Sequence, residues 1–181
     1  ISGIELNISC PNVAAGGMEF GVNPRLAAEV TAAVKAVTSL PVIVKLGPNV
    51  TDIVEISLAV EGAGADAVSL INTVKGMAID KGKHHLRVIS GGLSGPAIKP
   101  ISLRMVYDVA KAIRIPVIGC GGIACANDAL QFIMVGASAV QVGTATLTNP
   151  HAALDTLEGI EHFMRDNQIE KLAELIGIAR T

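Results

Sequence analysis

Short runs rich in valine and isoleucine alternate with helix-like patterns along this chain, and this alternation constrains the fold more than any other feature. The runs predict strands at residues 4–9, 42–46, 67–71, 117–119 and 139–142. Helical patterns begin at Pro24 and Thr51, follow Pro100, and begin again near Asn127. We expect Thr51 and Asn127 to cap the helices that begin there. Strands separated by helices pair in parallel and are buried on both faces. The sequence therefore predicts an α/β fold with a parallel sheet.

One β/α junction occurs twice, as Gly64-Ala65-Asp66-Ala67-Val68 and as Gly136-Ala137-Ser138-Ala139-Val140. Repeated units are typical of a (β/α)8 TIM barrel, although an open doubly wound sheet would also fit. Polar and glycine-rich residues follow nearly every predicted strand, which favours the barrel, where all strand ends meet on one face. A complete barrel needs about 250 residues. We therefore expect residues 1–181 to form a single domain that supplies the last five β/α units, with the first three units upstream.

Charge and composition argue against two classes of partner. The chain has 14 Lys+Arg against 16 Asp+Glu and only 2% aromatic residues, which is unfavourable for nucleic-acid binding. No run of 18 consecutive apolar residues occurs, so we expect no membrane span. Three cysteines cannot all pair, and so low a number favours a reducing compartment, which predicts a cytoplasmic protein. Cys120 and Cys125 lack further ligands nearby and are interpreted as structural, with no metal site.

The segment 75–99 interrupts the regular spacing of the predicted elements. It contains Lys81-Gly82-Lys83-His84-His85 and a glycine-rich stretch that ends at Lys99-Pro100. An excursion of this size beyond a strand end is often a lid or a binding loop. A solvated hairpin is the alternative, and of the two we favour the functional loop.

Polar residues cluster at the end of the first predicted strand. Alternation along a strand places Asn7 and Ser9 on the same side. A buried asparagine needs a partner, since an unpaired buried polar group costs about 1–3 kcal/mol, and a bound polar ligand would supply one. Cys10 follows directly and can accept a proton as a thiolate, or it can be a small buried hydrophobe. Asn12 offers a second amide.

A lysine and a second amide pair occupy the next two predicted strands. Lys45 lies within the apolar run Val42-Ile43-Val44-Lys45-Leu46, where its charge needs a counter-charge or an electron-rich cofactor unless the side chain extends to the rim. Asn72 and Thr73 directly follow Ile71, which places an amide and a hydroxyl at a strand end.

Glycine clusters follow the last two predicted strands, as Gly119-Cys120-Gly121-Gly122-Ile123 and as Gly143-Thr144-Ala145. In β/α barrels, the loops after strands seven and eight frequently bind phosphate through backbone amides. The two clusters together therefore predict a cofactor that carries a phosphate.

With these residues in view, the chain resembles the class 1 dihydroorotate dehydrogenases, the FMN enzymes of pyrimidine biosynthesis. The resemblance covers nearly all 181 residues. Residues 76–80 and the stretch ending at Lys99-Pro100 are more similar to the NAD-linked 1B type than to the fumarate-linked 1A type. The motifs are Glu5-Leu6-Asn7-Ile8-Ser9-Cys10-Pro11-Asn12, Val44-Lys45-Leu46, Ile71-Asn72-Thr73, residues 91–100, Gly121-Gly122-Ile123 and Val142-Gly143-Thr144-Ala145.

The resemblance implies oxidation of (S)-dihydroorotate to orotate, with Cys10 as the base that takes the C5 proton while hydride passes from C6 to N5 of FMN. It assigns the pyrimidine and its carboxylate to Asn7, Asn12, Asn72 and Thr73. It assigns FMN to Asn7, Lys45, Ile71, Gly95, Gly121, Gly122, Gly143 and Thr144.

The 1B type further implies a partner subunit that carries FAD and a [2Fe–2S] cluster and passes electrons to NAD. Three cysteines are too few for this chain to hold such a cluster itself. Catalytic subunits of the family pair as a homodimer, which with two partner subunits makes a heterotetramer.

Other interpretations stay open at this point. A fumarate-linked 1A enzyme is one, and another FMN barrel oxidoreductase acting on a dihydropyrimidine is a second, since dihydropyrimidine dehydrogenase has a similar Asn-x-Ser-Cys-Pro motif. The non-enzymatic alternative is a degenerate barrel fragment that acts as an assembly module.

Overall fold

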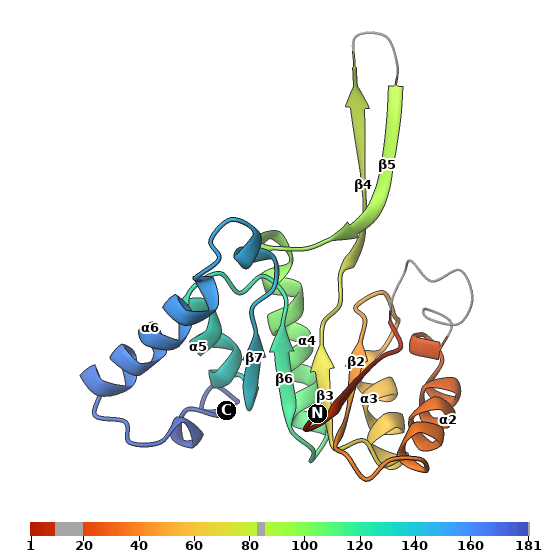
Figure 1. Cartoon of the computed structure of the whole chain (residues 1–181), viewed down its shortest axis with the longest axis horizontal. Helices are drawn as coiled ribbons and strands as arrows, with labels where there is room; N and C mark the ends of the chain where they lie inside the picture. The colour runs from red at the N-terminus through yellow and green to blue at the C-terminus, as the bar shows by residue number, and fades with distance from the viewer. Residues whose placement is uncertain (10–19, 83–85, 181) are drawn as a thin grey trace.

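The computed structural model describes residues 1–9, 20–82 and 86–180 (Figure 1). The elements in chain order are β1 (Ile4–Asn7), α2 (Pro24–Lys35), β2 (Val42–Leu46), α3 (Ile53–Gly62), β3 (Ala67–Leu70), β4 (Val74–Lys81), β5 (Leu86–Leu93), η1 (Pro96–Ile98), α4 (Lys99–Ala112), β6 (Val117–Cys120), α5 (Ala126–Met134), β7 (Ala139–Gln141), η2 (Thr144–Leu147), α6 (Ala152–Asp166) and η3 (Leu172–Glu174). None of the helices in these ranges has the length and apolar character that crossing a membrane requires.

The main sheet has five parallel strands in the order β1-β2-β3-β6-β7, which is also their order along the chain. A doubly wound sheet reverses its strand order at a switch point, and this sheet does not. Since parallel crossovers are right-handed, crossovers that all advance in one direction place their helices on one face. The predicted α/β fold is confirmed, and its topology is that of consecutive units of a β/α barrel.

The ends of the predicted elements need small corrections. The cap of α3 is Asp52 rather than Thr51, because the Asp52 carboxylate accepts hydrogen bonds from the amides of Val54 at 2.8 Å and Glu55 at 3.3 Å. Asn127 is not a cap either, since α5 begins one residue earlier, at Ala126. The predicted strands agree with the observed ones to within two residues at each end.

The core lies between the sheet and its helices. Val42, Val44 and Leu46 alternate toward the helices, and each is at most 1% exposed. On α5, Phe132 is fully buried and packs over Gly119, where an added Cβ would lie 2.6 Å from the ring atom Cδ1. Gly119 is therefore required for packing against the helix layer, since no larger residue fits beneath Phe132.

Strands β4 and β5 form an antiparallel hairpin that stands away from the rest of the described chain (Figure 1). Its apolar side chains are open to solvent, with Met77 70%, Val88 60% and Ile79 55% exposed. Its base is tied to the sheet by Asn49, which donates to the Thr73 carbonyl at 3.0 Å and accepts from the Lys75 amide at 2.9 Å. Segment 75–99 thus begins as a hairpin, the alternative that we did not favour; its role stays a prediction.

Candidate active site

A recess with about 560 Å³ of unfilled space, part of it open to solvent, lies at the carboxyl ends of the parallel strands. The parallel strands supply one side of it, and the residues that flank the β4–β5 hairpin supply another. Nine of the site residues predicted from the sequence line this recess: Lys45, Ile71, Asn72, Thr73, Gly95, Gly121, Gly122, Gly143 and Thr144. Cys10 and Asn12 lie outside the described residues, and so does His84-His85.

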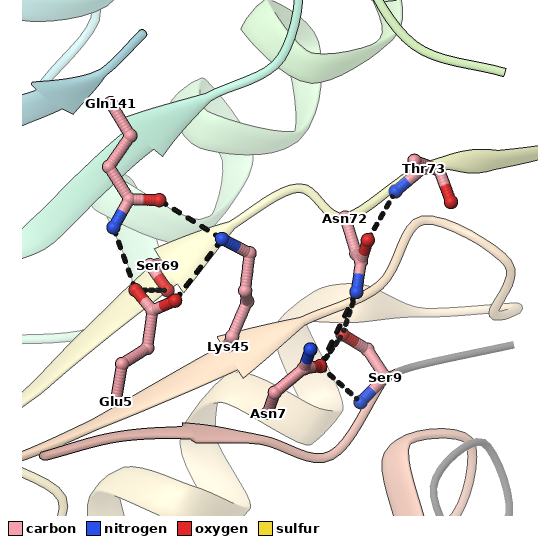
Figure 2. Close-up of polar contacts among 8 residues, drawn as sticks. All are labelled: Glu5, Asn7, Ser9, Lys45, Ser69, Asn72, Thr73 and Gln141. Atoms are coloured by element: carbon pink, nitrogen blue, oxygen red, sulfur yellow. Dashed lines mark hydrogen bonds and ion pairs between the residues drawn. The ribbon is translucent and has the colours of Figure 1, made fainter. Parts of the chain in front are cut away.

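Asn7 lies beside this recess rather than in its lining, and it belongs to a cluster of polar side chains (Figure 2). Its Oδ1 atom accepts hydrogen bonds from the Ser9 amide at 3.2 Å, the Ser9 hydroxyl at 3.1 Å and the Asn72 amide group at 3.3 Å. Asn7 is exposed, so the expectation that it is buried is wrong, while its role in binding a ligand stays a prediction. The cluster brings the ends of β1 and β3 together.

Asn72 is the link between this cluster and the recess. Its Nδ2 atom also donates to the Ser9 hydroxyl at 3.1 Å, and its Oδ1 atom accepts from the Thr73 amide at 2.8 Å. Gly92 of the hairpin approaches Thr73 so closely that an added Cβ would lie 2.2 Å from its hydroxyl oxygen. These contacts fix Asn72 and Thr73 as preformed polar groups on the recess wall.

Lys45 has a counter-charge within the chain, which the sequence analysis did not identify. Its Nζ atom lies 3.2 Å from Oε1 of Glu5 and donates to Oε1 of Gln141 at 3.1 Å (Figure 2). The other oxygen of Glu5 accepts from Ser69 at 2.9 Å and from Gln141 Nε2 at 2.7 Å. An electron-rich cofactor is therefore not needed to balance the charge of Lys45.

The environment of Glu5 keeps its carboxylate ionised. Burial works to raise the pKa of Glu5, but hydrogen bonds from Gln141 and Ser69 and the ammonium of Lys45 together hold that pKa below its ordinary value. One signal in the sequence pointed to this residue. Glu5 lies two residues before Asn7 in a strand, so both side chains project from the same face. Ser69 and Gln141 likewise lie two residues before Ile71 and Gly143, but only the sheet brings them to Glu5.

The two glycine clusters form turns that line the recess, and several of their backbone amides have no hydrogen-bond partner among the described residues. Among the described residues, the backbone N–H groups of Gly122, Ile123, Gly143 and Thr144 donate no hydrogen bond within the chain. Gly122 has a φ of +81°, and a Cβ there would lie 2.8 Å from the backbone nitrogen of Lys99. Gly143 differs, because a Cβ there would meet no atom within 4 Å. Packing against Lys99 requires a glycine at position 122, whereas a side chain at position 143 would enter open space.

Side chains behind the turns hold them in place. The Ser102 hydroxyl donates to the Cys120 carbonyl at 2.5 Å, and Asp128 accepts from Lys99 at 2.6 Å and from the Ala124 amide at 3.0 Å. Burial opposes ionisation of Asp128, but Lys99 and the Ala124 amide hold its pKa below the ordinary value. Cys120 faces the recess, and burial raises the pKa of its thiol, so it is an unsuitable base.

A wider depression between α3 and α4 has about 1350 Å³ of unfilled space, part of it open to solvent. Its charged groups are already engaged on the surface, as in the contact of Arg104 with Asp108 at 2.7 Å. The recess at the strand ends combines a lysine, two polar side chains and unpaired amides, so it is the candidate active site.

Comparison with known proteins shows the family and the fold of this chain. The family model for dihydroorotate dehydrogenase matches residues 1–164. The chain belongs to the dihydroorotate dehydrogenase family. The DHODH of Eimeria tenella, solved in complex with ferulenol, has the same fold, with a TM-score of 0.83 and 23% sequence identity over 99% of this chain and 54% of that chain.

Curated relatives within the family are more similar in sequence. Two proteins named dihydroorotate dehydrogenase B (NAD(+)), catalytic subunit, are 59% identical over 176 residues in Alkaliphilus oremlandii and 58% identical over 181 residues in Desulforamulus reducens. These matches cover 96% and 99% of this chain but 58% and 60% of the relatives. The chain thus spans about three fifths of the length of the curated relatives that it matches.

Proposed function

We propose that this protein uses FMN to oxidise (S)-dihydroorotate to orotate in pyrimidine biosynthesis. The observation that carries the proposal is the recess at the strand ends, which is lined by two glycine turns with unpaired backbone amides and by Lys45, Asn72 and Thr73. Membership of the dihydroorotate dehydrogenase family supports the same reaction.

The residues present fit a phosphate-bearing cofactor. The amides of Gly122, Ile123, Gly143 and Thr144 would bind the phosphate, since backbone N–H groups without partners are suited to an anion. The open space beside Gly143 leaves room for it. Lys45, Ile71, Gly95 and Gly121 line the remaining wall, and we propose that they contact the rest of FMN. Bound FMN would supply the hydride acceptor of the reaction.

The polar side chains would orient the substrate and remove its proton. Asn72 and Thr73 are held on the recess wall and would donate to the pyrimidine and its carboxylate, together with Asn7 and Asn12. Cys10, which directly follows Ser9 in the sequence, would take the C5 proton as a thiolate. Orientation by fixed amides supplies a large part of the rate enhancement in such a site.

We further propose that electrons leave through a partner subunit. The related proteins are named NAD(+)-dependent catalytic subunits, which supports NAD as the acceptor and a second subunit as its carrier. FAD and a [2Fe–2S] cluster on that subunit, and a homodimer of catalytic subunits in a heterotetramer, complete the proposal. The low number of cysteines supports a cytoplasmic location.

The test is an anaerobic absorption spectrum of the protein, expressed in its full natural length, before and after addition of dihydroorotate. We expect a bound flavin whose absorption bleaches with dihydroorotate. A flavin that stays oxidised would overturn the substrate and leave another dihydropyrimidine to be tried. Absence of flavin would overturn the oxidoreductase proposal and favour an assembly module.

A pair of cysteine variants tests the base. Cys10→Ala is expected to retain FMN and substrate affinity while slowing flavin reduction by orders of magnitude, because only proton removal is lost. Cys125→Ala is the matched control, since Cys125 is an exposed thiol outside the recess lining. Equal reduction rates in the two variants would exclude Cys10 as the base.

A further inference from the structure

Four polar side chains form a cluster on the concave face of the sheet, in which Glu5, Lys45 and Gln141 close a ring of hydrogen bonds and Ser69 donates to Glu5 (Figure 2). Glu5 on β1, Lys45 on β2, Ser69 on β3 and Gln141 on β7 take part, so the ring joins the first and last strands of the main sheet. Of the four, the proposed function uses only Lys45.

We infer that Glu5 is a positioning residue for the cofactor site: its carboxylate holds the ammonium of Lys45 and neutralises its charge, and so sets how strongly the site favours reduced over oxidised FMN. This inference rests on the proposed function.

The hydrogen bonds determine where the Lys45 ammonium lies. An ammonium has three donors, and those of Lys45 are directed at Oε1 of Glu5 at 3.2 Å and Oε1 of Gln141 at 3.1 Å, which leaves one for the recess. The orientation of the Gln141 amide is also determined. Its oxygen faces the ammonium, while its nitrogen donates to Glu5 at 2.7 Å. The opposite orientation would place two donors against each other.

The same contacts make the lysine electrostatically weaker than an isolated cation. Glu5 and Lys45 are 30% and 19% exposed in their side chains, so solvent screens their charges only partly. With both groups ionised, their charges sum to zero. Reduction makes a flavin richer in electrons, so a nearby cation favours the reduced form and a carboxylate beside that cation offsets the preference. Loss of the Glu5 charge should therefore strengthen the effect of Lys45.

The experiment compares Glu5→Gln with the wild-type protein, both in full natural length and loaded with FMN. The variant keeps the shape of the side chain and removes its charge. We expect the preference for reduced over oxidised FMN to rise about tenfold, which for a two-electron couple raises the midpoint potential by about 30 mV. Glu29→Gln is the matched control, because Glu29 pairs with Arg25 on the surface of α2 and should leave the potential unchanged.

A double variant separates an effect through Lys45 from a direct one. Without the ammonium, the Glu5 carboxylate would act on FMN only directly, and Glu5 does not line the recess. Adding Glu5→Gln to Lys45→Met should therefore change the equilibrium constant between oxidised and reduced FMN by less than twofold. A tenfold change in that background would mean that Glu5 does not act through Lys45, and would overturn the inference.

Gln141→Leu tests whether the hydrogen bonds of Gln141 keep the Lys45 ammonium in place, and it alters no charge. It removes one acceptor from Lys45 and one donor from Glu5. We expect FMN affinity to fall about fivefold, because a hydrogen bond to Lys45 is lost. The preference for reduced over oxidised FMN should stay within about twofold of wild type, because the charges are retained. This variant also tests the inference if Glu5→Gln does not fold, since unchanged FMN affinity would overturn it.

The outcomes separate this inference from the proposed function. Wild-type protein that binds no FMN would overturn the proposed function and the inference with it. Wild-type protein that binds FMN, combined with an unshifted potential in Glu5→Gln, would overturn the inference alone.

Discussion

Two sets of strands in this molecule have similar residues but different surroundings. All four residues of β3 in the main sheet are buried, whereas hairpin residues 77–81 are all exposed. The difference lies in what packs against each strand, since β3 has parallel strands on both sides and helices over one face, while the hairpin has only its own two strands. Apolar composition predicts that a segment forms a strand, but the elements packed around it decide whether it is buried.

The two regions meet at the recess. Thr73, just before the hairpin, and Ser94, just after it, both line the recess, and Ser94 accepts a hydrogen bond from Thr144 at 2.8 Å. The base of the hairpin therefore belongs to the candidate site, whereas its outer part contributes little packing. An isolated two-stranded hairpin is marginally stable in water, so the main sheet should supply nearly all the stability.

Truncation of a buried isoleucine in the main body should have the largest effect on stability. Ile56 on α3 is 3% exposed, and Ile56→Ala is expected to lower the free energy of unfolding by about 2–5 kcal/mol, through lost burial and a residual cavity. Urea denaturation measures this change. A loss below about 1 kcal/mol would show that α3 does not pack as described.

A side chain at Gly143 should block the recess without disturbing the fold. Gly143→Leu is expected to weaken FMN binding about 30-fold, or about 2 kcal/mol, because the side chain enters open space beside the unpaired amides. Titration with FMN under fluorescence detection measures the affinity. Gly62→Leu is the matched control, since a Cβ at Gly62 also meets no atom within 4 Å but lies at the end of α3. Equal losses in both variants would contradict a specific role for the space at Gly143.

Stability of the main body should depend on the ionisation of Asp66. Lys35 at 2.7 Å and the Val42 amide at 2.7 Å hold the pKa of Asp66 below its ordinary value. Because the folded-state pKa is the lower one, the stabilisation is fully present above the unfolded-state pKa and is lost as the pH falls through the folded-state value. Asp66→Asn should cost about 1 kcal/mol or less at pH 7, given that the ion pair is partly exposed, and less at low pH. Unfolding curves of both proteins from pH 7 to pH 3 measure this difference in the free energy of unfolding. A difference that grew toward low pH would contradict a stabilising role for the ionised Asp66 carboxylate.

Truncation of an isoleucine in the hairpin should have the smallest effect. Ile79 is 55% exposed, so Ile79→Ala is expected to change the free energy of unfolding by about 0.5 kcal/mol or less, in contrast to Ile56→Ala. Hydrogen exchange sharpens the same comparison, because hairpin amides should exchange faster than those of β2 and β3. A cost for Ile79→Ala equal to that of Ile56→Ala would show that the hairpin is packed in solution.

Much of the fold follows from local patterns. The valine- and isoleucine-rich runs and the prolines at helix starts were sufficient for the five strands of the main sheet and their parallel arrangement, because a period and a propensity act over a few residues. They did not predict β4 and β5. Helix starts were less predictable. Thr51 and Asp52 are both good caps, and only the backbone geometry at Asp52 selects between them.

The candidate site, too, could be predicted from the sequence only in part. The sequence alone determined which residues lie at or just after strand ends, and strand ends of a parallel sheet converge, so Lys45, Asn72, Gly122 and Gly143 could be assigned to one site. The partners of those residues depended on the tertiary structure. Gln141 is 136 residues from Glu5 in the chain, and no local pattern links them. Only the three-dimensional course of the sheet brings Glu5, Lys45, Ser69 and Gln141 together, because β1 and β7 are its two edge strands and no strand pairing in the described part of the chain joins them.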